Sequence, residues 1–163
     1  MNILGTGLSG LIGSRVIELL EPAWSFQNLS LETGVDITNR QTVDDAVLAT
    51  NASWVFHFAA FTDVDGAERE KDKGARGSVW QINVTATEYL VEACRKEKKH
   101  LLYISTDFVF DGEKESYSED DIPNPISWYA QTKYEGEKRV LSLGDDALVV
   151  RIANPYRANP SGN

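Results

Sequence analysis

The chain has 163 residues, of which 42% are hydrophobic and 25% charged, a composition that excludes collagen-like and wholly disordered proteins. The formal net charge of −9 argues against nucleic acid as a partner, because an acidic surface repels a phosphate backbone. Cys94 is the one cysteine, so a disulfide framework within the chain and a cysteine-rich metal site are excluded; we expect a buried thiol and no metal. No apolar run approaches the roughly 20 residues that span a bilayer, and the N-terminus lacks a basic signal region. We therefore expect a cytoplasmic protein with no membrane partner.

Strand and helix patterns alternate along the whole chain. Runs of β-branched and aromatic residues predict strands, and apolar residues at helical spacing predict helices. In chain order these are a strand at 1–5, a helix at 11–20, a strand at 24–31, a helix that begins near Thr38, a strand at 53–60, a helix at 78–97, a strand at 101–106, an acidic loop at 111–125, a helix at 127–143 and a strand at 147–152. Such alternation predicts an α/β fold with a doubly wound parallel sheet, the Rossmann fold.

Local signals predict how two of the helices begin. Thr38 with Gln41, and Ser78 with Gln81, have the spacing of a capping box at a helix N-terminus. The mixed charges at residues 68–76 predict a solvated loop or helix face that leads into the second of these helices.

A glycine-rich turn follows the first predicted strand directly. The segment Gly5-Thr-Gly7-Leu-Ser-Gly10-Leu-Ile-Gly13 contains two overlapping spacings, Gly-x-Gly-x-x-Gly and Gly-x-x-Gly-x-x-Gly, and a helix is expected to open immediately. Glycine permits a tight turn and a close approach of backbone to a pyrophosphate, while the helix N-terminus offers free N–H groups. In this strand–turn–helix context the motif predicts a dinucleotide-binding site.

The sequence does not choose between NAD and NADP. Glu32 lies at about the distance from the turn at which an acidic residue binds the ribose of NAD, and no arginine stands beside it to bind the 2′-phosphate of NADP. Arg15 is expected to be an exposed residue of the first helical turn. Asp36 and Ile37 are candidates for contact with the adenine, with a turn-capping role for Asp36 as the alternative.

Tyr129 and Lys133 lie four residues apart in a predicted helix, so they share one face. A free tyrosine has a pKa near 10, and its phenolate must be stabilised before it exchanges protons near neutral pH. We expect the Lys133 ammonium, together with an oxidised nicotinamide ring, to lower the pKa of Tyr129 for that purpose. Ser105 and Thr106 end a predicted strand, where side chains of a parallel sheet face the ligand crevice. A hydroxyl at that position can bind a substrate carbonyl.

Three longer segments carry a family resemblance: AAFTDVDGAE at 59–68, STDFVFDG at 105–112 and WYAQTKYEGEK at 128–138. With the glycine-rich turn, they resemble the extended short-chain dehydrogenases/reductases and, more narrowly, the dTDP-4-dehydrorhamnose reductase family of sugar-nucleotide reductases. The match covers nearly the whole chain. Phe108 stands where the similar sugar-nucleotide 4,6-dehydratases place a glutamate, which argues against dehydration.

The resemblance implies NADH- or NADPH-dependent reduction of a nucleotide-linked 4-keto-6-deoxy sugar. Thr106, Tyr129 and Lys133 would form the catalytic triad, in which Tyr129 protonates the sugar oxygen, Thr106 orients it and Lys133 holds the nicotinamide ribose. The remaining residues that the resemblance implies around the cofactor are Gly7, Gly10, Leu11, Ile12 and Gly13 at the pyrophosphate, Phe58, Ala59, Ala60 and Thr62 on the ribose side, and Asn83 near the active site.

Members of the family continue into a second lobe that binds the sugar nucleotide. The resemblance therefore implies that residues 1–163 are the NAD(P)-binding Rossmann domain with the substrate-binding lobe largely absent, either because the chain is truncated before that lobe or because the protein lacks it. We expect the isolated chain to bind cofactor and to show poor or no turnover. The resemblance leaves a homodimer open.

Two other functions stay open. Residues 151–156, Arg-Ile-Ala-Asn-Pro-Tyr, are similar to the epimerase branch, whose members would retain bound NAD. STDFVFDG followed by SEDDIPNP also resembles the regulatory subunit of methionine adenosyltransferase, a non-catalytic subunit that would co-purify with a partner. The complete set of Thr106, Tyr129 and Lys133 favours an enzyme, because a protein that only binds has no need of it.

Overall fold

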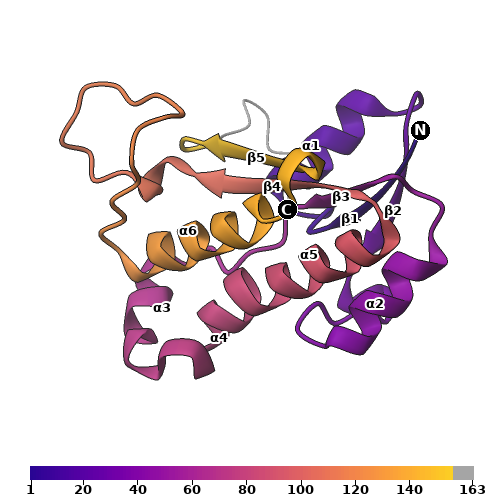
Figure 1. Cartoon of the computed structure of the whole chain (residues 1–163), viewed down its shortest axis with the longest axis horizontal. Helices are drawn as coiled ribbons and strands as arrows, with labels where there is room; N and C mark the ends of the chain where they lie inside the picture. The colour runs from indigo at the N-terminus through magenta and orange to yellow at the C-terminus, as the bar shows by residue number, and fades with distance from the viewer. Residues whose placement is uncertain (156–163) are drawn as a thin grey trace.

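The computed structural model describes residues 1–155, and its centre is a five-stranded sheet in the order β2-β1-β3-β4-β5 (Figure 1). The strands are β1 (Asn2–Thr6), β2 (Ser25–Leu29), β3 (Trp54–His57), β4 (His100–Thr106) and β5 (Ala147–Ile152). All neighbouring pairs are parallel. From β1 the chain winds to β2 on one side and then to β3 on the other, so the predicted doubly wound Rossmann sheet is confirmed. Tyr156, which ends the segment similar to epimerases, lies outside the described residues.

Helices cover both faces of this sheet (Figure 1). One face carries α1 (Leu11–Leu20), and the other carries α2 (Arg40–Ala49), α5 (Ala86–Glu97) and α6 (Trp128–Leu141). The shorter elements are α3 (Val64–Arg69), α4 (Ser78–Trp80), the π-helical segment η3 (Gln81–Thr85) that joins α4 to α5, and the 3-10 turns η1 (Leu31–Thr33), η2 (Lys71–Arg76), η4 (Asp107–Val109) and η5 (Gly144–Asp146). Within residues 1–155, no helix has the length and apolar character needed to cross a membrane.

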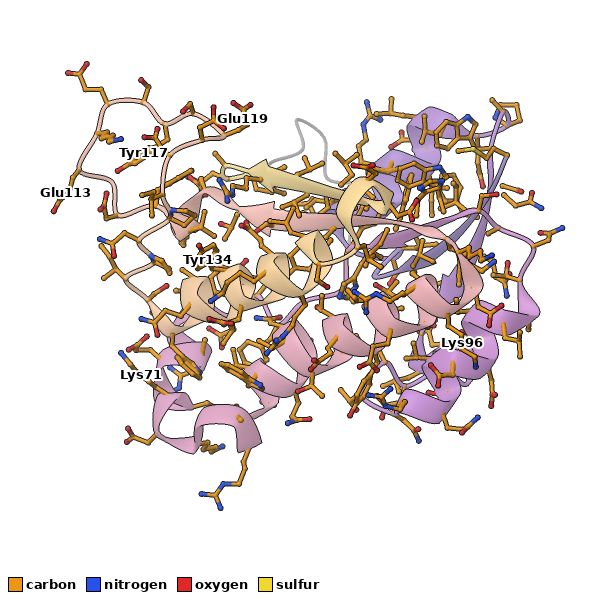
Figure 2. The ribbon with its side chains drawn as sticks, viewed as in Figure 1. Lys71, Lys96, Glu113, Tyr117, Glu119 and Tyr134 are labelled. Carbon is orange, nitrogen blue, oxygen red and sulfur yellow. The ribbon has the colours of Figure 1, made fainter. Side chains whose placement is uncertain are left out.

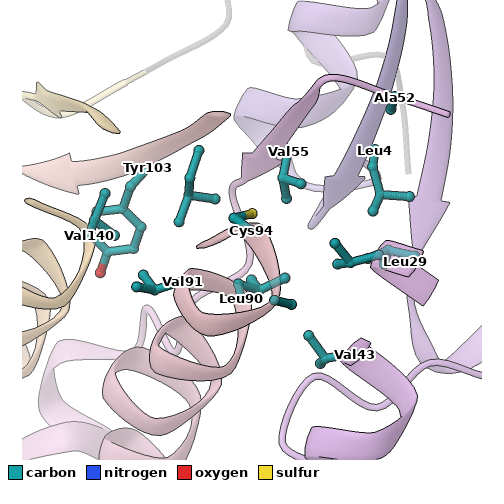
Figure 3. Packing of buried hydrophobic residues seen from close by; sticks show 13 residues of the cluster. Leu4, Leu29, Val43, Ala52, Val55, Leu90, Val91, Cys94, Tyr103 and Val140 are labelled. Carbon is teal, nitrogen blue, oxygen red and sulfur yellow. The ribbon is translucent and has the colours of Figure 1, made fainter. Parts of the chain in front are cut away.

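The main core lies between the sheet and the helices α2, α5 and α6 (Figure 3). Leu4 and Val55 from adjacent strands are fully buried there, opposite Leu90 and Cys94 of α5. Burial raises the pKa of the Cys94 thiol to about 12, so this residue packs as a small apolar side chain, as predicted.

The two predicted capping boxes are wrong, because residues from neighbouring segments take their place. Asn39 is the N-cap of α2, and its side chain accepts a first-turn N–H, while the Thr38 hydroxyl donates to Asp36 Oδ1 (2.7 Å). At the second helix the Ser78 hydroxyl donates to the carboxylate of Glu70 (2.7 Å). A carboxylate from outside the helix therefore satisfies its first turn.

The charged residues 68–76 are largely exposed, as predicted, but they also anchor the helix that carries Tyr129. Glu68 Oε2 accepts the N–H of Trp128, the first residue of α6 (2.9 Å). That hydrogen bond is the main reason why the pKa of Glu68 is lowered. The predicted loop at 111–125 extends away from the sheet, as the labelled Glu113 and Tyr117 show (Figure 2).

Helix α6 approaches η3 so closely at Gly136 that no side chain fits. A Cβ there would lie 2.5 Å from the Tyr103 hydroxyl oxygen and 2.7 Å from the Asn83 carbonyl oxygen. Gly136→Ala is expected to lower the free energy of unfolding by about 1–3 kcal/mol through overpacking, although alanine favours helix more than glycine does. Urea unfolding measures this loss. Adding Tyr103→Phe to Gly136→Ala removes one of the two clashes and should recover part of the lost stability. If Gly136→Ala alone is as stable as wild type, the close approach of α6 is contradicted.

Candidate functional site

A cavity of about 770 Å³ opens at the carboxyl ends of the strands. This is the edge at which doubly wound sheets bind their ligands. Its lining comes from the glycine-rich turn, the segments that follow β2 and β3, the end of β4 and one face of α6. The predicted site residues that line it are Gly7, Gly10, Leu11, Ile12, Gly13, Asp36, Ile37, Phe58, Ala59, Ala60, Thr62, Thr106, Tyr129 and Lys133. Asn83 does not line it.

The glycine-rich turn forms a cradle that side chains would fill. Gly7 has a φ of +65°, and a Cβ there would lie 2.5 Å from the backbone nitrogen of Ala59. A Cβ at Gly13 would lie 2.5 Å from the Gly7 carbonyl oxygen. Gly10 is the N-cap of α1 and supplies no side-chain cap. A narrow backbone cradle beside an uncapped helix N-terminus fits a diphosphate group.

The segment that follows β2 differs in part from the prediction. Asp36 lines the cavity, and its Oδ1 accepts from both the backbone N–H and the hydroxyl of Thr38, so it also has the turn-capping role. Glu32 lies in η1 and is not among the lining residues, whereas Ser30, directly after β2, is. Arg15 is half-exposed and pairs with an acidic residue of its own helix. Neither Glu32 nor Arg15 is therefore placed to distinguish the ribose of NAD from that of NADP.

Helix α6 brings the predicted tyrosine and lysine to the cavity. Ser127 caps the helix by accepting the Ala130 N–H (3.2 Å), which places Tyr129 in the first turn and Lys133 one turn later. Lys133 is 3% exposed, and its ammonium donates to the Ile104 carbonyl on β4 (2.8 Å). Burial lowers the pKa of Lys133 to about 7, and the negative charge of Glu137 offsets part of this lowering.

The pKa of Tyr129 is raised above its usual value of 10 by the surrounding protein. Burial is the main cause, the charge of Asp107 adds to it, and a hydrogen bond with Thr106 works against it. The predicted lowering requires Lys133 together with a bound oxidised nicotinamide and stays a prediction; in this structure the lysine donates to the Ile104 backbone carbonyl. Of the contributions to the pKa of Tyr129, only the hydrogen bond with Thr106 lowers it.

Lys133 should leave a signature in the pH dependence of stability. Its pKa of about 7 in the folded chain lies below the usual lysine pKa of 10.5, so between these two values the unfolded chain binds a proton that the folded chain does not. Raising the pH through this window therefore favours the folded state, with a slope of at most about 1.36 kcal/mol per pH unit. We expect the unfolding free energy of wild type minus that of Lys133→Met, measured in urea, to rise from pH 7 to 10. A flat difference would contradict the buried lysine.

Glu137, one turn after Lys133 on α6, forms an ion pair with Arg151 of β5. Glu137 is fully buried, and its two carboxylate oxygens accept from Arg151 Nε (3.0 Å) and Nη2 (2.8 Å) on β5. This bidentate pair joins α6 to the edge of the sheet. The position of the lysine is thus fixed by both β4 and β5.

Three further residues line the cavity at the ends of β4 and β5. Ser105 is 2% exposed and faces the cavity, and its hydroxyl has no hydrogen-bond partner among residues 1–155. Asp107 and Asn154 also line it, just beyond the ends of β4 and β5. Ser105 was expected there, because ligands meet the carboxyl ends of parallel strands, and the same rule would have found Asp107 and Asn154.

Asn83 acts from behind the cavity. It is 1% exposed within η3, and its Oδ1 accepts the N–H of Phe61 (2.8 Å) while its Nδ2 donates to the Thr132 hydroxyl (3.0 Å). It therefore ties the segment after β3 to α6. Short π-helical segments of this kind are frequent at functional sites.

A second cavity of about 750 Å³ lies beside the first and shares three lining residues with it, Val64, Asp107 and Phe108. The loop after β4 supplies much of its lining, including the carboxylates of Asp111 and Glu119. The shared Asp107 directly follows Thr106, and the shared Phe108 packs edge-on against the Tyr129 ring, so the two cavities adjoin beside these two residues.

Comparison with known proteins gives three findings. The model of a family described as "RmlD substrate binding domain" matches residues 1–163. The chain is 34% identical over 153 residues to dTDP-4-dehydrorhamnose reductase of Aggregatibacter actinomycetemcomitans, covering 93% of this chain and 50% of that protein. It is 32% identical over 161 residues to methionine adenosyltransferase 2 subunit beta of Bos taurus, covering 94% and 47%.

A solved structure is similar over the same span. The crystal structure of dTDP-4-dehydrorhamnose reductase from Bacillus anthracis in complex with NADP matches with a TM-score of 0.83 and 32% identity, covering 93% of this chain and 53% of that one. The chain thus spans about half the length of the curated relatives it matches.

Proposed function

Because the chain belongs to the RmlD substrate binding domain family, we propose that residues 1–163 form an NAD(P)-binding Rossmann domain that carries the catalytic residues of a sugar-nucleotide reductase. The observation that carries this proposal is one cavity lined both by the glycine-rich turn and by Thr106, Tyr129 and Lys133. A turn that fits a diphosphate and a tyrosine–lysine pair in one cavity suit a dinucleotide-dependent carbonyl reduction.

The backbone of the turn would hold the pyrophosphate of the cofactor, with Gly7 and Gly13 allowing its close approach. Asp36 and Ile37 would lie at the adenine, and residues 58–62 along the ribose. When bound, the nicotinamide supplies the hydride for carbonyl reduction. NADP is bound by the similar reductase of Bacillus anthracis, and we propose NADP or NAD as the cofactor here.

Three side chains would act on the substrate carbonyl. Tyr129 donates a proton to the carbonyl oxygen of the substrate. Thr106 orients that carbonyl oxygen and stabilises the phenolate that Tyr129 becomes. Lys133, one helical turn from Tyr129, holds the nicotinamide ribose and, when charged, favours the phenolate. Its pKa of about 7 places this charge change near neutral pH.

We propose a nucleotide-linked 4-keto-6-deoxy sugar as the substrate, as in the relative from Aggregatibacter actinomycetemcomitans. The second cavity, which meets the first at Asp107 and Phe108, would admit the sugar. Carboxylates accept hydrogen bonds from sugar hydroxyls but repel a diphosphate. The sugar therefore fits there better than the phosphates do.

Two measurements test this function. Titration with NADPH and NADH should show saturable binding, and protein in excess over cofactor should oxidise it when dTDP-4-keto-6-deoxy sugar is added at high concentration. Excess protein compensates for weak binding of the sugar, so the chemical step becomes visible. Absence of cofactor binding would overturn the proposal.

A second candidate is a non-catalytic subunit that works through a partner, favoured by the 32% identity to methionine adenosyltransferase 2 subunit beta. Such a protein would bind the dinucleotide, show no oxidation of it under the same conditions, and co-purify with another protein. Turnover that depends on Tyr129 would exclude this candidate.

A further inference from the structure

A chain of hydrogen bonds runs behind the cavity from β1 to α6, and His57 is its middle link. His57 ends β3 and is 1% exposed. Its Nδ1 lies 2.7 Å from the Thr6 hydroxyl on β1, and its Nε2 lies 3.0 Å from the Thr87 hydroxyl on α5. The proposed reaction does not use this imidazole.

The neighbouring bonds determine which ring nitrogen carries the proton. Thr87 donates its single hydroxyl proton to the Asn83 carbonyl (2.9 Å), so towards His57 it can only accept, and Nε2 must donate. Nδ1 is then the acceptor for the Thr6 hydroxyl proton. The Thr6 oxygen in turn accepts the N–H of Ala59, which lines the cavity (3.2 Å).

The same chain reaches the helix of the tyrosine through Asn83. The Asn83 amide donates to the Thr132 hydroxyl, and Thr132 donates to the Tyr129 carbonyl (2.8 Å). Each of the three hydroxyl groups along the path therefore donates once and accepts once. Reversing the imidazole would take away the acceptor of the Thr6 hydroxyl proton and would leave no proton between Nε2 and the Thr87 oxygen.

We infer that His57 is a positioning residue: a neutral imidazole with its proton on Nε2, which holds Ala59 in place relative to Asn83 and Tyr129. The groups around it agree with a neutral ring. Burial and the nearby positive charge of Lys133 lower the pKa of His57 to about 3. The ring of Tyr103 packs against the imidazole, with 5.4 Å between the two ring centres. The chain of hydrogen bonds thus keeps one direction throughout the physiological pH range.

Imidazole ¹⁵N NMR of the full chain tests the tautomer without any ligand. The chain has two histidines, so His57→Gln and the surface variant His100→Gln assign the signals. We expect His57 to show a single neutral ring protonated at Nε2, with shifts unchanged between pH 5 and 8. A ring protonated at Nδ1, or a titration midpoint inside that range, overturns the inference.

Substitutions at Thr6 test whether the chain positions the cavity lining. Thr6→Val keeps the shape but removes the hydroxyl between His57 and Ala59, and should weaken NADPH binding about tenfold. Thr6→Ser restores the hydroxyl and should restore the affinity. Adding His57→Phe to Thr6→Val should cause little further loss, because both substitutions cut the same chain. Wild-type affinity in Thr6→Val, or no rescue by serine, contradicts the positioning role.

The inference rests on the proposed function only for the choice of NADPH as the probe. If the wild-type chain binds no dinucleotide, the proposed function fails, and the NMR experiment still decides the state of His57. If the dinucleotide binds but the ring carries its proton on Nδ1, the inference fails and the proposed function stands.

Discussion

Tyr129→Phe is expected to lower NADPH- or NADH-dependent reduction of the keto sugar by about 10²- to 10⁴-fold, the usual contribution of a positioned acid or base. The substitution removes only the hydroxyl that would protonate the substrate. The ring remains to pack edge-on against Phe108, with 6.4 Å between the ring centres. Cofactor affinity should change little, because backbone groups of the glycine-rich turn would bind the phosphates.

Tyr134→Phe is the matched control for this experiment. Tyr134 lies on the same helix (Figure 2) and lines neither cavity. The Tyr134→Phe variant should reduce the keto sugar at the wild-type rate. Single-turnover assays that follow the absorbance of the reduced cofactor measure this rate. Unchanged turnover in Tyr129→Phe would show that the assigned chemistry is wrong.

Gly7→Ala is expected to weaken cofactor binding by about 10- to 100-fold or more and also to destabilise the fold, since overpacking costs about 1–3 kcal/mol. The added Cβ would lie 2.5 Å from the Ala59 nitrogen and 2.7 Å from the Phe58 carbonyl carbon. These are backbone atoms that cannot move without displacing the cavity lining. NADPH titration and urea unfolding measure the two effects.

Gly144→Ala separates the clash from backbone strain. Gly144 has a φ of +66°, nearly that of Gly7, but a Cβ there meets nothing within 4 Å. It should lose about 1–2 kcal/mol of stability from the left-handed conformation alone and keep its cofactor affinity. Equal cofactor affinity in Gly7→Ala and Gly144→Ala would argue against a ligand at the turn.

Much of the fold was predictable, because short apolar strands and amphipathic helices leave local patterns. Leu11–Leu20 and Ala147–Ile152 begin and end where predicted. The strand predicted at 53–60 ends at His57 instead, although the apolar residues continue. There the Phe58 N–H still bonds to the Thr6 carbonyl (3.1 Å), and the following residues turn to line the cavity. Periodicity cannot distinguish a buried strand from an apolar cavity lining.

The site was predictable where a motif fixed it and not where distant segments meet. The glycine-rich turn and the Tyr129–Lys133 pair were predicted and lie in one cavity. The raised pKa of Tyr129 was not predicted, because it depends on burial and on Asp107 and Thr106 more than on helical spacing. The path through His57 joins β1, β3 and α5, so no local pattern could indicate it.

A crystal structure with NADP⁺ bound tests the central claim most directly. We expect the pyrophosphate to lie against the backbone of residues 7–13 and the nicotinamide to lie beside the Tyr129 hydroxyl and Lys133. A dinucleotide bound outside this cavity, or one whose nicotinamide lies away from Tyr129, would contradict it.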